Sequence, residues 1–223
     1  MTQIAENIAR IRHTLPAGVR LVAVSKFHPV SSIQEAYDAG QRLFGESRVQ
    51  ELLQKTTQLP ADIEWHFIGH LQSNKVKMIV PFVSLIHSID SPRLLAEVDK
   101  AGARAGRVVD CLLQIHIAAE ETKFGFTVGE CEAFLESGVW REYDWVRICG
   151  VMGMATFTDD EARIRAEFDT LKRFFDRAKS LYFPDRDFFK EISMGMSDDW
   201  PLAVASGSSM VRVGSRIFGA RIY

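Results

Sequence analysis

Residues 20–44 read RLVAVSKFHPVSSIQEAYDAGQRLF, and this stretch decides the fold. It begins with the apolar run Arg20–Ser25, continues as the amphipathic helical pattern Ser31–Ala39 with a serine cap, and reaches a second short run at Arg42–Phe44. A short run that is apolar on both faces is typical of a parallel strand covered by helices. The stretch therefore predicts a strand, a crossover helix and a second strand parallel to the first.

The same pattern continues along almost the whole chain of 223 residues. Eight strands with a helix in each gap predict a closed (β/α)8 barrel of the TIM type. An open doubly wound sheet would have fewer strands and a glycine fingerprint after the first strand, which this sequence lacks. Because no linker or shift in composition divides the chain, we expect a single domain over residues 1–223. The further predicted strands are Glu64–Ile68, Leu85–Ile89, Val108–Ile117, Trp145–Val151, Asp187–Ile192 and Met210–Val213. The further predicted helices are Gln3–His13, Ser47–Gln54, Gln72–Val80, Pro92–Ala103, Val128–Glu136, Asp159–Leu181 and Asp198–Ala205.

The composition narrows the class of protein. Hydrophobic residues make up 47% of the chain and charged residues 25%, which excludes a disordered or low-complexity chain. The formal net charge is −2 and no basic run occurs, so we expect neither a nucleic acid nor a membrane as partner. The widely spaced Cys111, Cys131 and Cys149 form no CxxC motif, which favours free buried thiols in a reducing compartment. The N-terminus does not resemble a signal peptide and no apolar run has transmembrane length, so we expect a cytoplasmic protein.

Lys26 follows the first predicted strand directly. In barrels of this type the functional site lies at the carboxyl ends of the strands, so the polar residues after each strand are the candidates. A lysine removed from water there has a lowered pKa and forms a Schiff base with an aldehyde. The alternative is a lysine whose stem packs against the barrel while its ammonium stays in water, and the spacing alone favours that alternative.

The loops after the seventh and eighth strands contain small and hydroxyl residues. Ser193 and Gly195 end one strand, and Gly214 and Ser215 end the next and open a short final helix. Small residues let backbone N–H groups approach an anion, and the helix N-terminus adds a favourable dipole. Two ordinary capped helices are the alternative, but the position in the barrel favours a phosphate site. A lysine opposite a phosphate site indicates an aldehyde phosphate, for which pyridoxal 5′-phosphate (PLP) is the obvious candidate.

His70 and Ser47 are weaker candidates. His66 and His70 are four residues apart, but they span the end of a strand, so we reject a zinc site and assign His70 to the lining of the barrel mouth. Ser47 is expected to cap the helix after the second strand.

Five stretches then resemble the pyridoxal phosphate homeostasis protein family. They are VSK at 24–26, FGE at 44–46 with RVQE at 48–51, WHFIGHLQSNK at 65–75, SMGMSDD at 193–199, and GSSMVRVGS at 207–215 followed by IFGAR at 217–221. The resemblance runs in order from the first strand to the C-terminus. It implies a single barrel similar to the N-terminal domain of alanine racemase.

The resemblance also implies how a cofactor is held. It places a Schiff base with PLP on Lys26 and the pyridine nitrogen near Arg212. This sequence departs from the family pattern at two positions. The family usually has asparagine in place of Ser47 and often has asparagine in place of His116. The cofactor-binding residues that the resemblance implies are Lys26, Ser193, Met194, Gly195, Arg212, Gly214 and Ser215, with Ser47 and His70 as further candidates.

The function implied by the resemblance is intracellular PLP homeostasis and delivery, without an established catalytic reaction. PLP and, transiently, apo-enzymes that use it are the expected partners of a monomer. The alternative is an amino-acid racemase, which needs acid–base groups on both faces of the substrate. In alanine racemase a tyrosine from a second domain of the partner subunit supplies one of them, whereas none of Tyr37, Tyr143, Tyr182 and Tyr223 follows a predicted strand. A third possibility is a regulatory barrel that binds another phosphate ester without using Lys26.

Overall fold

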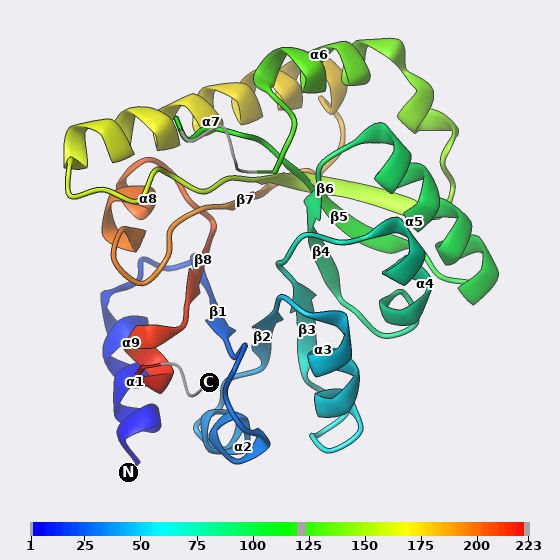
Figure 1. Cartoon of the computed structure of the whole chain (residues 1–223). Coiled ribbons are helices and arrows are strands. Elements are labelled where there is room, and N and C mark those ends of the chain that lie inside the picture. Colours follow the sequence, from blue (N-terminus) through cyan, green and yellow to red (C-terminus); the bar gives the residue numbers. More distant parts are fainter. Residues whose placement is uncertain (1, 120–123, 221–223) are drawn as a thin grey trace.

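The structure is a computed structural model that describes residues 2–119 and 124–220. Its strands are all parallel and form one closed barrel in the order β1-β2-β3-β4-β5-β6-β7-β8 (Figure 1). This confirms the predicted (β/α)8 architecture. The strands are β1 (Arg20–Val24), β2 (Leu43–Glu46), β3 (Glu64–Phe67), β4 (Leu85–Ile89), β5 (Val109–Gln114), β6 (Val146–Met152), β7 (Glu191–Ser193) and β8 (Met210–Val213).

Helices surround the barrel and connect successive strands (Figure 1). Helix α1 precedes the first strand and contacts both α2 and the last helix, α9. The α-helices are α1 (Gln3–Thr14), α2 (Val30–Asp38), α3 (Val49–Thr56), α4 (Val76–Ile79), α5 (Pro92–Ala105), α6 (Val128–Ser137), α7 (Glu161–Tyr182), α8 (Trp200–Ala205) and α9 (Ser215–Phe218), and two short 3-10 helices cover Ser73–Lys75 and Val139–Glu142.

The barrel closes where β1 pairs with β8. Leu21 lies opposite Val211 and Val22 lies opposite Arg212 in this parallel pair. The larger apolar core lies between the strands and the helices, as expected for strands that are apolar on both faces. A smaller apolar cluster forms a second core from Val22, Leu85, Leu112, Cys149, Met152 and Met210.

Some element boundaries differ from the sequence predictions. The strand predicted at Asp187–Ile192 is the three-residue β7 at Glu191–Ser193. Phe189 stacks on Phe183 at 4.1 Å and on Phe175 at 5.0 Å between ring centroids. Phe189 is therefore apolar because it packs against α7 and the residue that follows it. A buried strand residue is equally apolar, so the sequence pattern did not distinguish the two.

The predicted helix caps after the first two strands are also wrong. Helix α2 begins at Val30 after Pro29, with no side-chain cap, although Ser31 was the expected cap. Helix α3 begins at Val49 after Arg48, again without a side-chain cap, and Ser47 lies one residue earlier. The three cysteines are free and buried, as predicted. Within the described part of the chain, no helix is long and apolar enough to cross a membrane.

Candidate functional site

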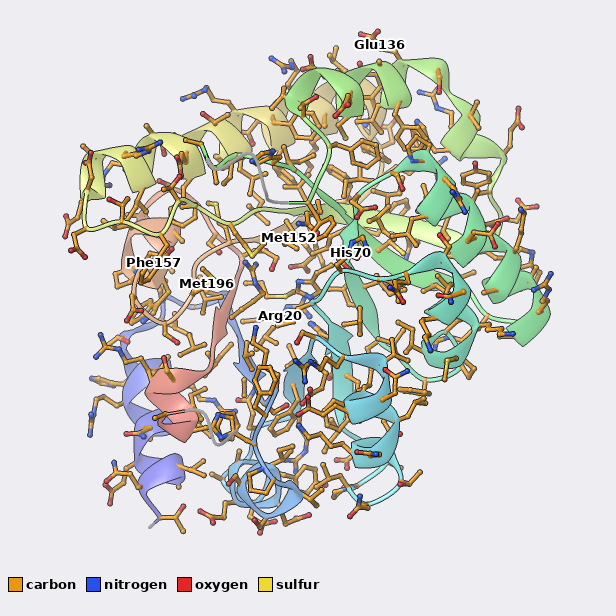
Figure 2. All side chains as sticks on the ribbon, in the orientation of Figure 1. Arg20, His70, Glu136, Met152, Phe157 and Met196 are labelled. Atoms are coloured by element: carbon orange, nitrogen blue, oxygen red, sulfur yellow. The ribbon has the colours of Figure 1, made fainter. Side chains whose placement is uncertain are left out.

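A cavity of about 300 Å³ lies at the carboxyl ends of β1 and β8. Its polar lining brings Lys26 of the turn after β1 together with Arg212 of β8 and Ser215 at the start of α9. Phe157 and Met196 also line it, and Figure 2 shows them on the α8 side of the barrel. The remaining lining residues are Val24, His28, Ile68, Met154, Ser197, Asp198, Asp199, Gly214 and Gly219.

Two side chains hold the backbone on both sides of Lys26. Lys55 Nζ donates to the carbonyl oxygen of Ser25 at 2.8 Å, and Glu51 Oε1 accepts from the N–H of Phe27 at 2.6 Å. Lys55 and Glu51 are themselves ion-paired, with 2.7 Å between Nζ and Oε1. One ion pair on α3 therefore fixes both peptide groups that flank the lysine.

Phe27 has a backbone conformation that side chains rarely adopt. Its φ is +67°, and it is the one residue other than glycine with a positive φ among those described. Such a conformation costs on the order of 1–2 kcal/mol, and it persists only where surrounding contacts impose it. Here the contacts are the Glu51 hydrogen bond and the guanidinium of Arg48, which lies 4.6 Å from the Phe27 ring centroid. The strained turn sets the direction in which the chain leaves Lys26.

A buried carboxylate completes this support. Glu46 Oε1 accepts from Ser25 Oγ at 2.6 Å and from Lys55 Nζ at 2.7 Å, whereas its Oε2 has no hydrogen-bond partner among the described residues. Burial raises the pKa of Glu46, and the charge of Lys55 opposes that rise. We call Ser25, Glu46, Glu51 and Lys55 the Lys55 cluster. It is a polar network directly beneath the turn that carries Lys26.

Arg212 presents a fixed cation to the other side of the cavity. It is buried on β8, and its guanidinium donates to Ser193 Oγ at 2.6 Å and to the carbonyl oxygen of Gly153 at 3.1 Å. Burial lowers the pKa of Arg212 to about 10, so it remains protonated at neutral pH. An arginine only donates, so the guanidinium N–H groups that are not used by Ser193 and Gly153 are donors for a ligand in the cavity.

The start of α9 offers a second set of donors. The first N–H groups of any helix have no acceptor within that helix, and they favour an anion. Gly214 precedes Ser215 there, and its own N–H donates to Ser197 Oγ at 3.2 Å. A Cβ on Gly214 would lie 3.1 Å from the carbonyl oxygen of Val24, so a side chain at this position would crowd β1.

Three other candidates from the sequence support the site without lining the cavity. Ser193 is fully buried beneath Arg212, and its Oγ also lies 3.0 Å from His87 Nδ1. The N–H of Met194 donates to the carbonyl oxygen of Met210, and the carbonyl of Gly195 accepts from the N–H of Arg212. These residues join β7 to β8 and so hold Arg212 in place.

Ser47 and His70 lie outside the cavity, as does His116. His70 is exposed, with its Nδ1 3.0 Å from Asp90 Oδ2, and its ring stacks on Phe124 at 3.9 Å between ring centroids. In Figure 2 it lies well away from Phe157 and Met196. The backbone of Ser47 packs so closely against Gly69 that a Cβ on Gly69 would lie 2.3 Å from the Ser47 carbonyl oxygen.

Several residues at this site have no role assigned to them from the sequence. His28 lines the cavity and stacks on Phe218 of α9 at 5.0 Å. Phe157 lines the cavity although it is 87% exposed, which marks it as an apolar residue at an open rim. The position of His28 two residues after Lys26 was a usable signal, whereas Phe157 and the Lys55 cluster have no local pattern that identifies them.

The tyrosines described by the structure do not line this cavity. Tyr37 donates to Asp62 at 2.7 Å on the protein surface, and the hydroxyl of Tyr182 lies 3.4 Å from Glu136 Oε1. Tyr143 packs against the larger core, and Tyr223 lies outside the described residues.

Comparisons with known proteins agree with this geometry. Residues 1–222 match the family described as alanine racemase, N-terminal domain. The chain is 37% identical over 211 residues to the pyridoxal phosphate homeostasis protein of Synechocystis, with 94% of each chain covered. It is 40% identical to PipY of Synechococcus elongatus, with 97% of this chain and 100% of PipY covered. The TM-score is 0.90 against PipY without PLP and 0.87 against PipY with PLP bound.

A more distant similarity concerns the fold alone. Alanine racemase from Bartonella henselae has a TM-score of 0.74 at 15% identity, and the match covers 98% of this chain but 59% of that enzyme. The shared barrel confirms the predicted likeness to the N-terminal domain of alanine racemase.

Proposed function

The chain belongs to the family of pyridoxal phosphate homeostasis proteins, and we propose that it holds PLP as a Schiff base on Lys26. The observation that carries this proposal is that one cavity brings together Lys26, Arg212 and the start of α9. PipY, at 40% identity, has been solved with PLP bound, which supports the same ligand here.

The cavity fits the cofactor in size and in chemistry. Its volume of about 300 Å³ is at the lower end of the range for small-molecule sites. The apolar side chains of Val24, Ile68 and Met154 suit an aromatic ring, and Ser215 with the first amides of α9 suits a phosphate. PLP supplies an aldehyde, whose carbon bonds to Lys26 Nζ while the carbonyl oxygen leaves as water, in a reversible step.

We assign Arg212 to the pyridine nitrogen. A protonated arginine donates a hydrogen bond to that nitrogen but does not give up its proton, because its pKa of about 10 lies well above neutral pH. The ring therefore stays neutral and is a weak sink for electrons. This property favours storage of the cofactor over transamination or decarboxylation.

We further propose that the protein is a carrier without a catalytic reaction of its own. The racemase alternative needs a second acid–base group opposite the lysine. Among the described residues, no tyrosine lines the cavity, although His28 does. In the carrier role, the protein would release PLP to apo-enzymes in the cytoplasm and act as a monomeric single domain.

The direct test is intact mass and peptide mapping after borohydride reduction in the presence of PLP. We expect one reduced adduct on Lys26, and we expect Lys26→Ala to abolish it while the fold is retained, because Lys26 lies in a turn outside the core. Lys77→Ala is the matched control, since Lys77 is an exposed lysine on α4 outside the cavity. A persistent adduct in Lys26→Ala, or an adduct on another lysine of the wild type, would contradict the assignment.

A further inference from the structure

A second and larger cavity lies at the opposite end of the barrel. Its volume is about 710 Å³, and its lining comes from the amino ends of the strands. The proposed PLP site uses the carboxyl ends, so the known chemistry of the fold leaves this cavity unexplained. The histidine and the charged residues that line it are His66, Arg20, Glu64, Asp110, Arg147, Lys190 and Glu191.

His66 forms part of the floor of this cavity, which we call the amino-end cavity. Its side chain is almost fully buried, with a relative exposure of 2%, and its Nδ1 lies 3.0 Å from His87 Nε2. The other ring nitrogen, Nε2, has no hydrogen-bond partner within the part of the chain that the structure describes. Nε2 is not among the buried side-chain atoms that lack a partner, so it is open to the cavity, where a ligand or water is its partner.

A chain of hydrogen bonds links this nitrogen to Arg212 through the interior of the barrel. His66 contacts His87, His87 Nδ1 lies 3.0 Å from Ser193 Oγ, and Ser193 Oγ accepts from Arg212 at 2.6 Å. A wholly apolar interior would avoid burying these polar groups, which is costly unless every one of them is satisfied. The two cavities at opposite ends of the barrel are therefore joined by one continuous polar path.

The donor and acceptor roles along this path follow from Arg212. Because arginine only donates, the Ser193 oxygen accepts from it. Among the described residues His87 Nδ1 is the one acceptor within reach of the Ser193 proton, so the hydroxyl donates to that nitrogen. His87 then carries its proton on Nε2 and donates to His66 Nδ1. His66 consequently carries its proton on Nε2, and it presents an N–H donor to the amino-end cavity.

Three cations and three carboxylates line the cavity, and two of the cations are paired, Arg20 with Glu191 and Arg147 with Asp110. Burial and then the charge of Arg20 lower the pKa of His66 to about 3, so the ring is a neutral donor at neutral pH. Arg20 is half-exposed at the start of β1 (Figure 2), and its Nη2 lies 2.9 Å from Glu191 Oε1 in an ion pair. Lys190 has no ion-pair partner among the described residues. A ligand carboxylate accepts from a neutral N–H and is stabilised by Lys190, with Arg20 as a second cation that it shares with Glu191.

We propose that the amino-end cavity binds a small carboxylate, which accepts from His66 Nε2–H between Arg20 and Lys190, and that His87 and Ser193 couple this site to Arg212. The coupling rests on the proposed function, whereas the binding site does not. Glu64 stands at the rim, at the start of β3, and its carboxylate suits an ammonium group on the same ligand. Amino acids and simple carboxylic acids both carry the carboxylate that this cavity would recognise. Only amino acids carry the ammonium group that would contact Glu64.

The binding half is tested by calorimetric titration of the cofactor-free protein with two probes, pyruvate and alanine. We expect saturable binding of at least one, and Arg20→Gln should weaken it about tenfold or more, as for loss of a charged hydrogen-bond partner. Arg10→Gln on α1, outside this cavity, is the matched control and should leave binding unchanged. If alanine binds more tightly than pyruvate and Glu64→Gln weakens the binding of alanine, the cavity is an amino-acid site. If pyruvate binds and Glu64→Gln leaves its affinity unchanged, the cavity is a site for simple carboxylates.

Two further measurements test the protonation of His66 and the coupling to the PLP site. Histidine ¹⁵N spectra should show His66 protonated on Nε2 and should shift when the probe binds. In the PLP-loaded protein, the probe should change the cofactor absorbance, and His87→Leu should retain binding but lose that change. No saturable binding, or binding unaffected by Arg20→Gln, would overturn the site. Binding without an absorbance change would overturn the coupling, while borohydride labelling of Lys26 tests the proposed function separately.

Discussion

At the scale of single residues, the position of Lys26 depends on contacts made by its neighbours. Lys55 and Glu51 hold the peptide groups on either side of it, and the Phe27 backbone is held in a left-handed conformation. A covalent ligand needs its amine in a defined place, because a small misplacement of a reacting group costs much of the gain from proximity. The Lys55 cluster is therefore a set of positioning residues for the proposed PLP site.

Glu51→Ala is the variant that tests this role. It removes the acceptor for the Phe27 N–H and one partner of Lys55, so we expect PLP to be retained about tenfold less tightly, the equivalent of one lost charged hydrogen bond. Glu51→Gln keeps an amide oxygen for the Phe27 N–H and should restore most of the loss. The measurement is the equilibrium constant for PLP from absorbance titration, with circular dichroism to verify the fold. Equal affinity in both variants would argue against positioning through this contact.

At the scale of elements, the short helix α9 is held in place by its neighbours. Asn7 of α1 donates to the carbonyl oxygen of Ile217 at 3.0 Å, and His28 stacks on Phe218. A helix of four residues has little stability of its own, so these tertiary contacts fix the direction of its N-terminus. The strand end at Gly214 is equally constrained, because Val24 of β1 lies directly against it.

Ser215→Asp tests whether α9 holds the phosphate. The new carboxylate would stand beside the phosphate and repel it, so we expect the affinity for PLP to fall about tenfold or more, the equivalent of at least 1.4 kcal/mol. Ser215→Asn is the control, since it has a similar size without the charge. The comparison is made by titrating both proteins with PLP and with pyridoxal, which lacks the phosphate. A loss that is the same for both ligands would show that Ser215→Asp does not act through the phosphate.

At the scale of the whole molecule, the barrel encloses a polar path within an apolar interior. His66 and His87 are buried as neutral rings, and burial is the main cause that lowers the pKa of each below its usual value near 6.5. In the unfolded chain both rings would take up protons below that value. The unfolded state then binds more protons than the folded state, so the free energy of unfolding falls as the pH decreases.

This sign leads to a prediction about acid stability. Between pH 6.5 and about 3, where His66 stays neutral in the folded protein, it should contribute a slope of up to about 1.4 kcal/mol per pH unit. His66→Gln should flatten the pH dependence in that window, whereas His13→Gln on the exposed end of α1 should leave it unchanged. Equilibrium urea unfolding at a series of pH values gives the comparison. A slope that His66→Gln leaves unaltered would show that His66 titrates normally in the folded state.

The sequence alone predicted much of the site because its signals are local. Lys26 follows an apolar run, and Gly214 and Ser215 follow the last strand, so the rule that barrel sites lie at the carboxyl ends was sufficient to select them. Ser47 and His70 satisfied the same rule, yet they lie outside the cavity. Position after a strand places a residue at the correct end of the barrel, but the direction of its side chain depends on packing against neighbouring loops.

The sequence by itself determined the order of strands and helices, the closed barrel and the end at which the proposed PLP site lies, because hydrophobic periodicity and strand ends are properties of adjacent residues. Only the tertiary structure decided which polar groups meet inside. Ser193 and His87 are 106 residues apart, and Ser25 and Lys55 are 30 apart, yet each pair is in hydrogen-bond contact. Such contacts depend on the register of strands around the closed barrel, which no local pattern encodes. The amino-end cavity and its path to Arg212 therefore became visible only in the folded molecule.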